Sequence, residues 1–101
     1  MAIAEVSVLP VGTGSPSVSQ YVVGAVSVLL KEKGLKYELT SMGTIVEGDL
    51  DSILSAVRKM HEAPFSKGVM RVITSIKIDD RRDRPATGQD KIESVKQKLN
   101  A

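Results

Sequence analysis

The residues best suited to chemistry lie in one short run, Met42-Gly43-Thr44-Ile45-Val46-Glu47-Gly48. Glu47 stands there between an apolar residue and a glycine, where burial of an ionised carboxylate is costly unless a partner compensates it. Thr44, three residues earlier, adds a hydroxyl that can donate or accept a hydrogen bond. We therefore expect this run to line a ligand site. The alternative is a solvated Glu47 at the end of a strand.

A few side chains elsewhere could also take part. Ser17 and Ser19 fall at an expected helix start, where backbone amide donors are free. Ser17 is expected to cap the helix, whereas capping and ligand contact are equally open for Ser19. His61 lies at the end of another helix with no nucleophile or second base near it in sequence, so we expect no catalytic role for it.

The composition excludes several kinds of site. The chain has no cysteine and a single histidine, which removes thiolate nucleophiles, disulfides and a two-histidine metal site within one chain. Metal sites built from carboxylates alone, or between subunits, stay open. We expect a protein that is not an enzyme and that carries no cofactor and no metal.

The charge pattern argues against two classes of partner. The net charge is only +2, and the run over residues 79–84 mixes acids with arginines. Stacking on RNA needs aromatic residues on strands, and the chain has three aromatics in all. No apolar run approaches the roughly 18 residues of a membrane span, and we see no secretory signal. We expect no nucleic-acid or membrane partner, and a cytoplasmic location by default.

Alternating apolar and polar residues predict four strands. They cover residues 2–10, where Pro10 is expected to end the strand, 35–41, 44–48 and 69–79. The second and third of these form a hairpin through a turn at Met42-Gly43.

Apolar residues at helical spacing predict three helices. The first runs over about residues 18–33, after a capping box of Ser17 with Gln20. The second follows the cap Asp49 and stops before Ala63-Pro64. The third opens at Thr87, and its thin apolar stripe suggests a lid or a contact with another subunit.

This order of elements predicts an α+β fold. It is the ferredoxin-like βαββαβ sandwich, with an additional C-terminal helix, in a single domain over residues 1–101. Right-handed crossovers place both main helices on one face of the antiparallel sheet. The opposite face then carries a mixture of apolar and polar residues, which favours association with another subunit. These residues are Ile3, Glu5, Ser7, Leu9, Arg71, Ile73, Ser75 and, in one reading, Glu47.

Several motifs together resemble the thiamine-binding protein family of small ferredoxin-like proteins. They are Val8-Leu9-Pro10-Val11-Gly12, Ser17-Val18-Ser19, the run from Met42 to Gly48, Gly68-Val69-Met70-Arg71-Val72 and Asp79-Asp80-Arg81-Arg82-Asp83. The similarity extends from about residue 3 to residue 99. The Thr-x-x-Glu-Gly run and the terminal Asp-x-Arg run are fairly specific as a pair, and either one alone is weak.

The resemblance implies a non-enzymatic homotetramer, a dimer of dimers, that binds thiamine or its hydroxymethylpyrimidine moiety. An aminopyrimidine presents a ring nitrogen acceptor beside an exocyclic amine donor, and Glu47 would accept from the amine. Thr44 and Ser19 would complete the polar contacts, while Met42 or Ile45 would supply an apolar wall. These five residues form the predicted ligand-binding set. The alternative is a regulatory interaction module without a small-molecule ligand.

Overall fold

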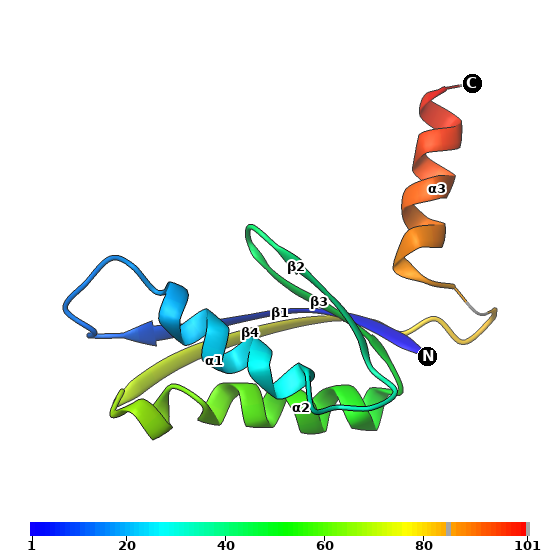
Figure 1. The fold of residues 1–101 in the computed structure, drawn as a ribbon. Coiled ribbons are helices and arrows are strands. Elements are labelled where there is room, and N and C mark those ends of the chain that lie inside the picture. The colour runs from blue at the N-terminus through cyan, green and yellow to red at the C-terminus, as the bar shows by residue number, and fades with distance from the viewer. Residues whose placement is uncertain (85, 101) are drawn as a thin grey trace.

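The computed structural model describes residues 1–84 and 86–100. The elements follow the predicted order of the ferredoxin-like fold, with the additional C-terminal helix, and this prediction is confirmed (Figure 1). In chain order they are β1 (Ala2–Val11), α1 (Ser19–Leu29), β2 (Lys36–Thr40), β3 (Gly43–Gly48), α2 (Leu50–Glu62), the short 3-10 helix η1 (Phe65–Lys67), β4 (Arg71–Asp79) and α3 (Gly88–Leu99).

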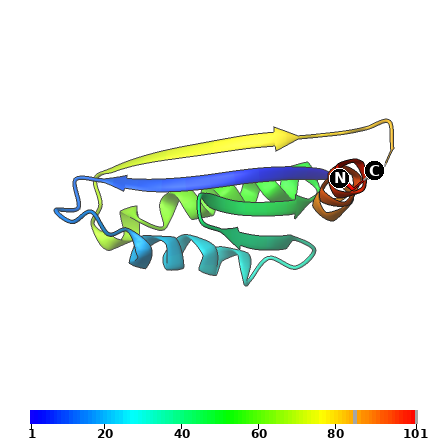
Figure 2. The same cartoon turned by 90° about the horizontal axis from the view of Figure 1, so that it is seen from above.

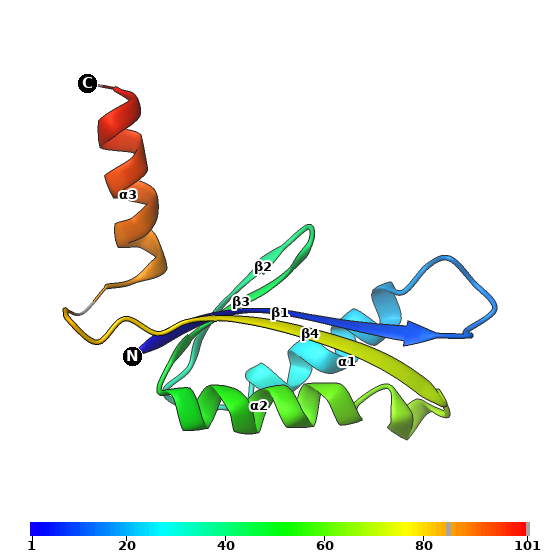
Figure 3. The same ribbon diagram turned by 180° about the vertical axis from the view of Figure 1, so that it is seen from behind.

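The four strands form one antiparallel sheet in the order β2-β3-β1-β4. Figure 2 shows this order from above, and Figures 1 and 3 show α1 and α2 together on one face. Ala4 in β1 lies opposite Val46 of β3 and Ile78 of β4, so these three side chains share the helix-covered face. Alternation then puts Ile3, Leu9 and Ile73 on the open face, as predicted.

The core lies between β1, β3 and the two helices. Its largest fully buried side chains include Val6, Val46, Ile53 and Met60. The cap of α2 forms as the sequence predicts, because the Asp49 carboxylate accepts from the Ser52 amide at 3.3 Å. A side-chain cap and an apolar stripe thus fix α2 against the sheet.

The first strand does not end at Pro10, as the sequence was expected to require. It continues to Val11 and pairs with β4 along its whole second half. Its pairing with β3, however, stops at Val6 opposite Thr44. Proline is tolerated in a strand where its missing N–H would face an unpaired side, and the end of β3 creates that side.

Two other boundaries differ from the prediction. The hairpin turn falls at Ser41-Met42 rather than Met42-Gly43, so β3 begins at Gly43. The first helix is shorter than expected, and its N-cap is Val18 without a side-chain cap hydrogen bond. The prediction of a capping box formed by Ser17 and Gln20 is therefore wrong. The Ser17 amide instead donates to the Ser15 hydroxyl at 3.2 Å, because serine competes for local backbone groups in loops.

The last helix stands away from the rest of the chain. Figures 1 and 3 show α3 upright beyond one end of the sheet, on the side opposite α1 and α2. Every residue from 89 to 100 is exposed, including the apolar stripe of Ile92, Val95 and Leu99. The predicted cap is confirmed, because Thr87 and Asp90 form a capping box. The described residues contain no helix long and apolar enough to cross a membrane.

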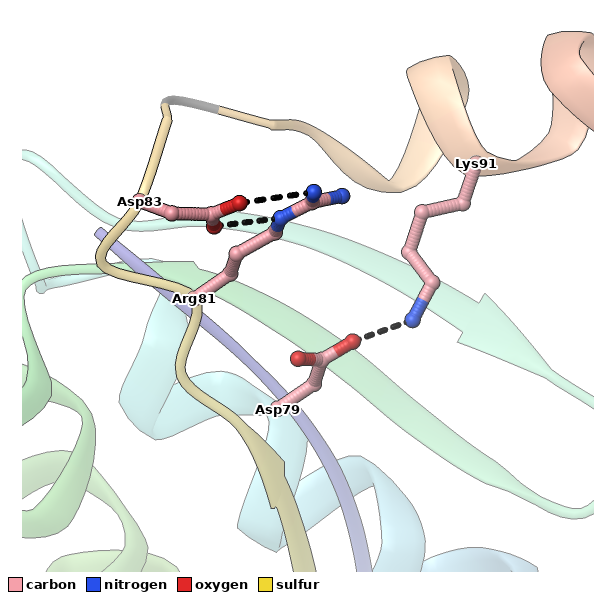
Figure 4. Close-up of polar contacts among 4 residues, drawn as sticks. All are labelled: Asp79, Arg81, Asp83 and Lys91. Atoms are coloured by element: carbon pink, nitrogen blue, oxygen red, sulfur yellow. Dashed lines mark hydrogen bonds and ion pairs between the residues drawn. The ribbon is translucent and has the colours of Figure 1, made fainter.

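Ion pairs hold the segment before α3. Arg81 donates to the two carboxylate oxygens of Asp83 at 2.5 and 2.8 Å, and Lys91 of α3 pairs with Asp79 at the end of β4 (Figure 4). The Arg81 hydrogen bonds lower the pKa of Asp83 to about 2. These side chains are largely exposed, so each pair stabilises the fold little on its own.

Candidate functional site

The predicted ligand-binding set is divided between the two faces of the sheet. Thr44 lies opposite Val6 and points toward the helices, whereas Ile45 and Glu47 lie opposite Glu5 and Ile3 on the open face. The run from Met42 to Gly48 therefore does not line a single site within one chain. Strand periodicity is the reason, since residues three apart point in opposite directions.

Glu47 has a partner within the chain. It is 8% exposed, and its Oε1 accepts a hydrogen bond from the Gly88 backbone amide at 2.6 Å. Gly88 is the first residue of α3, where amides lack intrahelical acceptors and a negative charge is favourable. The solvated alternative for Glu47 is thus wrong. The carboxylate anchors α3, and nothing in its surroundings connects it to the cavity on the other face.

A cavity of about 650 Å³ lies between the first half of α1, the second half of β1 and the tip of the β2–β3 hairpin. It exists because the hairpin ends before β1 does, which leaves part of the helix-covered face unfilled. Its apolar lining comes from all of these elements. It consists of Val6, Val8, Leu9, Val18, Val22, Val23, Ala25, Val26, Leu39, Met42 and Met60.

The polar lining of this cavity is made of hydroxyl and backbone groups. Ser7, Ser17, Ser19, Thr40, Ser41 and Thr44 line it, and no ionisable side chain does. Thr40 is already engaged, because its hydroxyl donates to the Gly43 carbonyl at 2.7 Å. Thr44 is 4% exposed, and its hydroxyl takes part in no side-chain hydrogen bond found among residues 1–84 and 86–100. It is the deepest polar group available to a ligand.

The start of α1 forms one rim of the cavity. Because no side chain caps this helix, its first amides and the Ser19 hydroxyl remain available at the rim. Met42 forms the other rim at the hairpin tip, where its side chain is 82% exposed. Three of the five predicted residues, Ser19, Met42 and Thr44, thus meet at one cavity.

His61 lies outside the cavity. Its Nδ1 is 2.7 Å from the Thr74 hydroxyl oxygen, and its ring packs edge-on against Phe65 at 5.4 Å. These contacts join the end of α2 to β4 and to the short helix η1, which follows α2. They give the only histidine a packing role.

Sequence reasoning missed the valines of α1 and the backbone of β1 beyond Val6. The valines served only to predict a helix, since apolar residues at helical spacing do not reveal which of them face a cavity. A signal for the backbone did exist. A proline within an alternating strand indicates an unpaired side, and Pro10 follows Val8 by two residues.

Comparison with known proteins identifies the family. The family model described as thiamine-binding protein matches residues 4–96. The chain belongs to this family. A UPF0045 protein of Bacillus subtilis is 48% identical over 102 residues, which cover 98% of each chain. The family resemblance drawn from the sequence motifs is therefore confirmed.

Solved structures agree on the fold. The crystal structure of a hypothetical protein from Methanocaldococcus jannaschii matches with a TM-score of 0.85 and 43% identity, over 95% of this chain and 96% of that one. A Thermotoga maritima protein provisionally named for thiamine biosynthesis or salvage matches with a TM-score of 0.74, over 93% of this chain and 97% of that one. That second protein is 19% identical, so the likeness concerns the fold alone.

Proposed function

We propose that this protein binds thiamine, or its hydroxymethylpyrimidine moiety, in the cavity between α1 and the β2–β3 hairpin. The observation that carries the proposal is an apolar cavity of about 650 Å³ with one buried hydroxyl, Thr44, at its base. Small-molecule sites have about this size and composition. The description of the matching family favours a thiamine-related ligand.

The lining suits the pyrimidine better than a phosphorylated group. A methylated pyrimidine ring is flat and largely apolar, and its nitrogens need only neutral hydrogen-bonding partners. A diphosphate needs cationic side chains, and the described lining contains none. We therefore assign the pyrimidine to the cavity. The cationic thiazolium of thiamine would lie toward the open rim at Met42, away from the N-terminus of α1.

The binding is proposed to be non-enzymatic. The cavity lining has hydroxyls but no base to activate them, and acid–base catalysis needs a titratable group within hydrogen-bonding reach. Residues 1–84 and 86–100 also contain no cluster of three potential metal-ligating side chains.

The assembly is proposed to be a homotetramer, a dimer of dimers. The open face exposes Leu9 and Ile73 at 45% and 47%, and α3 exposes a further apolar stripe on the same side. Unpartnered apolar surfaces of this kind favour association. The same surfaces support the second candidate function, a regulatory module that recruits another protein and needs no small ligand.

Native mass spectrometry separates these candidates. Purified protein would be sprayed alone and after addition of hydroxymethylpyrimidine, with uracil, a pyrimidine that carries oxo groups and no amine, as the control. The proposal predicts a tetramer that gains up to one hydroxymethylpyrimidine per chain and no uracil. A tetramer that takes up neither compound would favour the regulatory module, and a species of 10.8 kDa would contradict the assembly.

A further inference from the structure

We infer that the backbone N–H and C=O of Val8 form the recognition edge of the cavity and read the amine and the adjacent ring nitrogen of an aminopyrimidine. This inference rests on the proposed function and names the groups that give the site its specificity. It replaces Glu47, which lies on the other face of the sheet, as the partner of the exocyclic amine.

The direction of the Val8 backbone follows from the register of the sheet. A Cβ placed on Gly43 would lie 2.9 Å from the Val6 carbonyl oxygen, so the Val6 carbonyl points toward β3. The N–H and C=O of one strand residue point to the same neighbour, and the direction alternates with each residue. Val8 therefore points its N–H and C=O to the side of β3, as Val6 does.

No strand occupies that side at Val8. The β1–β3 register ends at Val6 opposite Thr44, and the hairpin turn at Ser41-Met42 lies directly before Gly43, the first residue of β3. No loop hydrogen bond found in the described part of the chain involves Val8. The place of Pro10 in the strand agrees with this geometry, because the N–H that it lacks would also face the unpaired side.

The lining of the cavity supports the same conclusion. Ser7 and Leu9 line the cavity although their side chains belong to the open face of the sheet, and Gly43, which has no side chain, lines it too. Their contribution is therefore that of the backbone, which means that the cavity reaches the free edge of β1. Thr44, the buried hydroxyl, ends the paired part of the ladder one step away.

The chemistry of this edge matches an aminopyrimidine. An unpaired strand residue offers one donor and one acceptor side by side, which is the pattern that an added strand would satisfy. The ring nitrogen accepts from the Val8 N–H, and the exocyclic amine donates to the Val8 C=O. Both partners lie in an apolar cavity, where an unmade hydrogen bond is costly. A pyrimidine with an oxo group in place of the amine presents an acceptor to the carbonyl and is rejected.

Calorimetry on two variants tests this inference. Val8→Pro removes the N–H and keeps an apolar side chain, and the neighbouring Pro10 indicates that proline fits this side of the strand. Val72→Pro is the matched control, because β4 is an edge strand and the Val72 N–H faces its free side, outside the cavity lining. Hydroxymethylpyrimidine would be titrated into wild type and both variants, together with the analogue that lacks the amine. Circular dichroism would check folding.

We expect Val8→Pro to weaken binding of hydroxymethylpyrimidine roughly tenfold, the cost of a buried acceptor left unpaired, and Val72→Pro to leave it within about twofold. Loss of the amine from the ligand is expected to weaken binding to wild type by a similar factor. Equal affinity of a folded Val8→Pro variant for hydroxymethylpyrimidine would overturn the Val8 assignment and leave the proposed function intact. Absence of any binding to wild type would instead overturn the proposed function.

If the Val8→Pro variant does not fold, NMR on the wild-type protein still tests whether the Val8 backbone binds the ligand. The Val8 amide proton is expected to move downfield as hydroxymethylpyrimidine saturates the protein, because it gains a hydrogen-bond acceptor. The Val6 amide, which is already paired with β3, serves as the internal control. A Val8 amide that does not shift while other cavity amides do would overturn the assignment.

Discussion

At the scale of single residues, Thr44 and Glu47 have separate roles. Thr44 points into the cavity from the helix-covered face, and Glu47 holds the first turn of α3 from the open face. The sequence identified both as chemically notable but grouped them in one site. Period-two alternation alone separates them, so this division could have been predicted. The contact between Glu47 and Gly88 could not be predicted, because the two residues lie 41 positions apart in the sequence.

Replacement of Thr44 by valine is expected to weaken hydroxymethylpyrimidine binding. Valine keeps the shape of threonine and removes the hydroxyl, so the ligand loses one neutral hydrogen bond, which contributes about 0.5–1.5 kcal/mol. Calorimetry would show a two- to tenfold rise in Kd. The matched control is Ser75→Ala, which removes a hydroxyl from the open face. A folded Thr44→Val variant that binds as tightly as wild type would remove Thr44 from the site.

Replacement of Glu47 by glutamine is expected to change stability rather than binding. Glutamine keeps an oxygen that can accept from the Gly88 amide but loses the charge that favours a helix N-terminus. The free energy of unfolding should fall by about 1–2 kcal/mol, the range for a partly buried charge in this position. Chemical denaturation would measure it, with Glu5→Gln on the same face as the control. A large loss of ligand affinity with unchanged stability would return Glu47 to the binding site.

At the scale of elements, the helices α1 and α3 differ in how their first turns are capped. The first turn of α1 has no side-chain cap and opens onto the cavity, whereas α3 has both a capping box and the Glu47 carboxylate. The strong α3 cap suits a helix whose residues from 89 to 99 are all exposed. A short isolated helix is marginal in water, so its first turn decides whether it forms.

The stability of α3 is expected to fall at low pH. Hydrogen bonds from the Thr87 backbone amide and then from its side chain lower the pKa of Asp90 below its usual value of 3.8. A carboxyl group with a lowered folded-state pKa stabilises the fold above its unfolded pKa, and this contribution disappears as the pH falls through the folded pKa. The protection factors of the α3 amides, which correct for the intrinsic pH dependence of exchange, should therefore fall below about pH 4.

The Thr87→Ala variant provides the comparison for this pH dependence. It removes the hydroxyl of the capping box and should speed amide exchange in α3 already at neutral pH, by an amount equivalent to about 1 kcal/mol. Its exchange should then change less with acidification than that of wild type. Identical pH profiles for the two proteins would show that the Asp90 cap does not control α3.

The order and type of the elements could be predicted because alternation and helical spacing are local properties of the sequence. Asp49 and Thr87 marked the starts of α2 and α3 correctly, since each is followed by the amide that it caps. Ser17 failed because Ser15 provided a nearer partner in the loop. The cavity could not be predicted, because it depends on how far two strands of unequal length remain paired, which is a tertiary property.

At the scale of the whole molecule, one face of the sheet is covered by helices and the other is not. Figure 1 shows α3 rising beyond one end of the uncovered face rather than lying across it. Leu9 and Ile73 lie directly opposite each other on neighbouring strands of that face. A second chain that packed there would remove both from water.

A charged side chain at Ile73 is expected to disrupt the assembly. Ile73→Glu would bury a carboxylate without a partner if the open face forms an interface. Light scattering should report about four times the chain mass of 10.8 kDa for wild type and a smaller species for the variant. Val23→Glu, at an exposed position on α1, controls for the added charge. An unchanged mass for Ile73→Glu would exclude the open face from the assembly.

The central claim is that a pyrimidine binds on the helix-covered face, and chemical-shift mapping tests it most directly. Hydroxymethylpyrimidine would be titrated into isotope-labelled protein while the backbone amide signals are followed. The account predicts saturable shifts that concentrate at Val8, Ser19 and Thr44, with the amides of Ile45 and Gly88 unchanged. Shifts confined to Ile45, Glu47 and Gly88 would place the ligand on the opposite face and contradict the account.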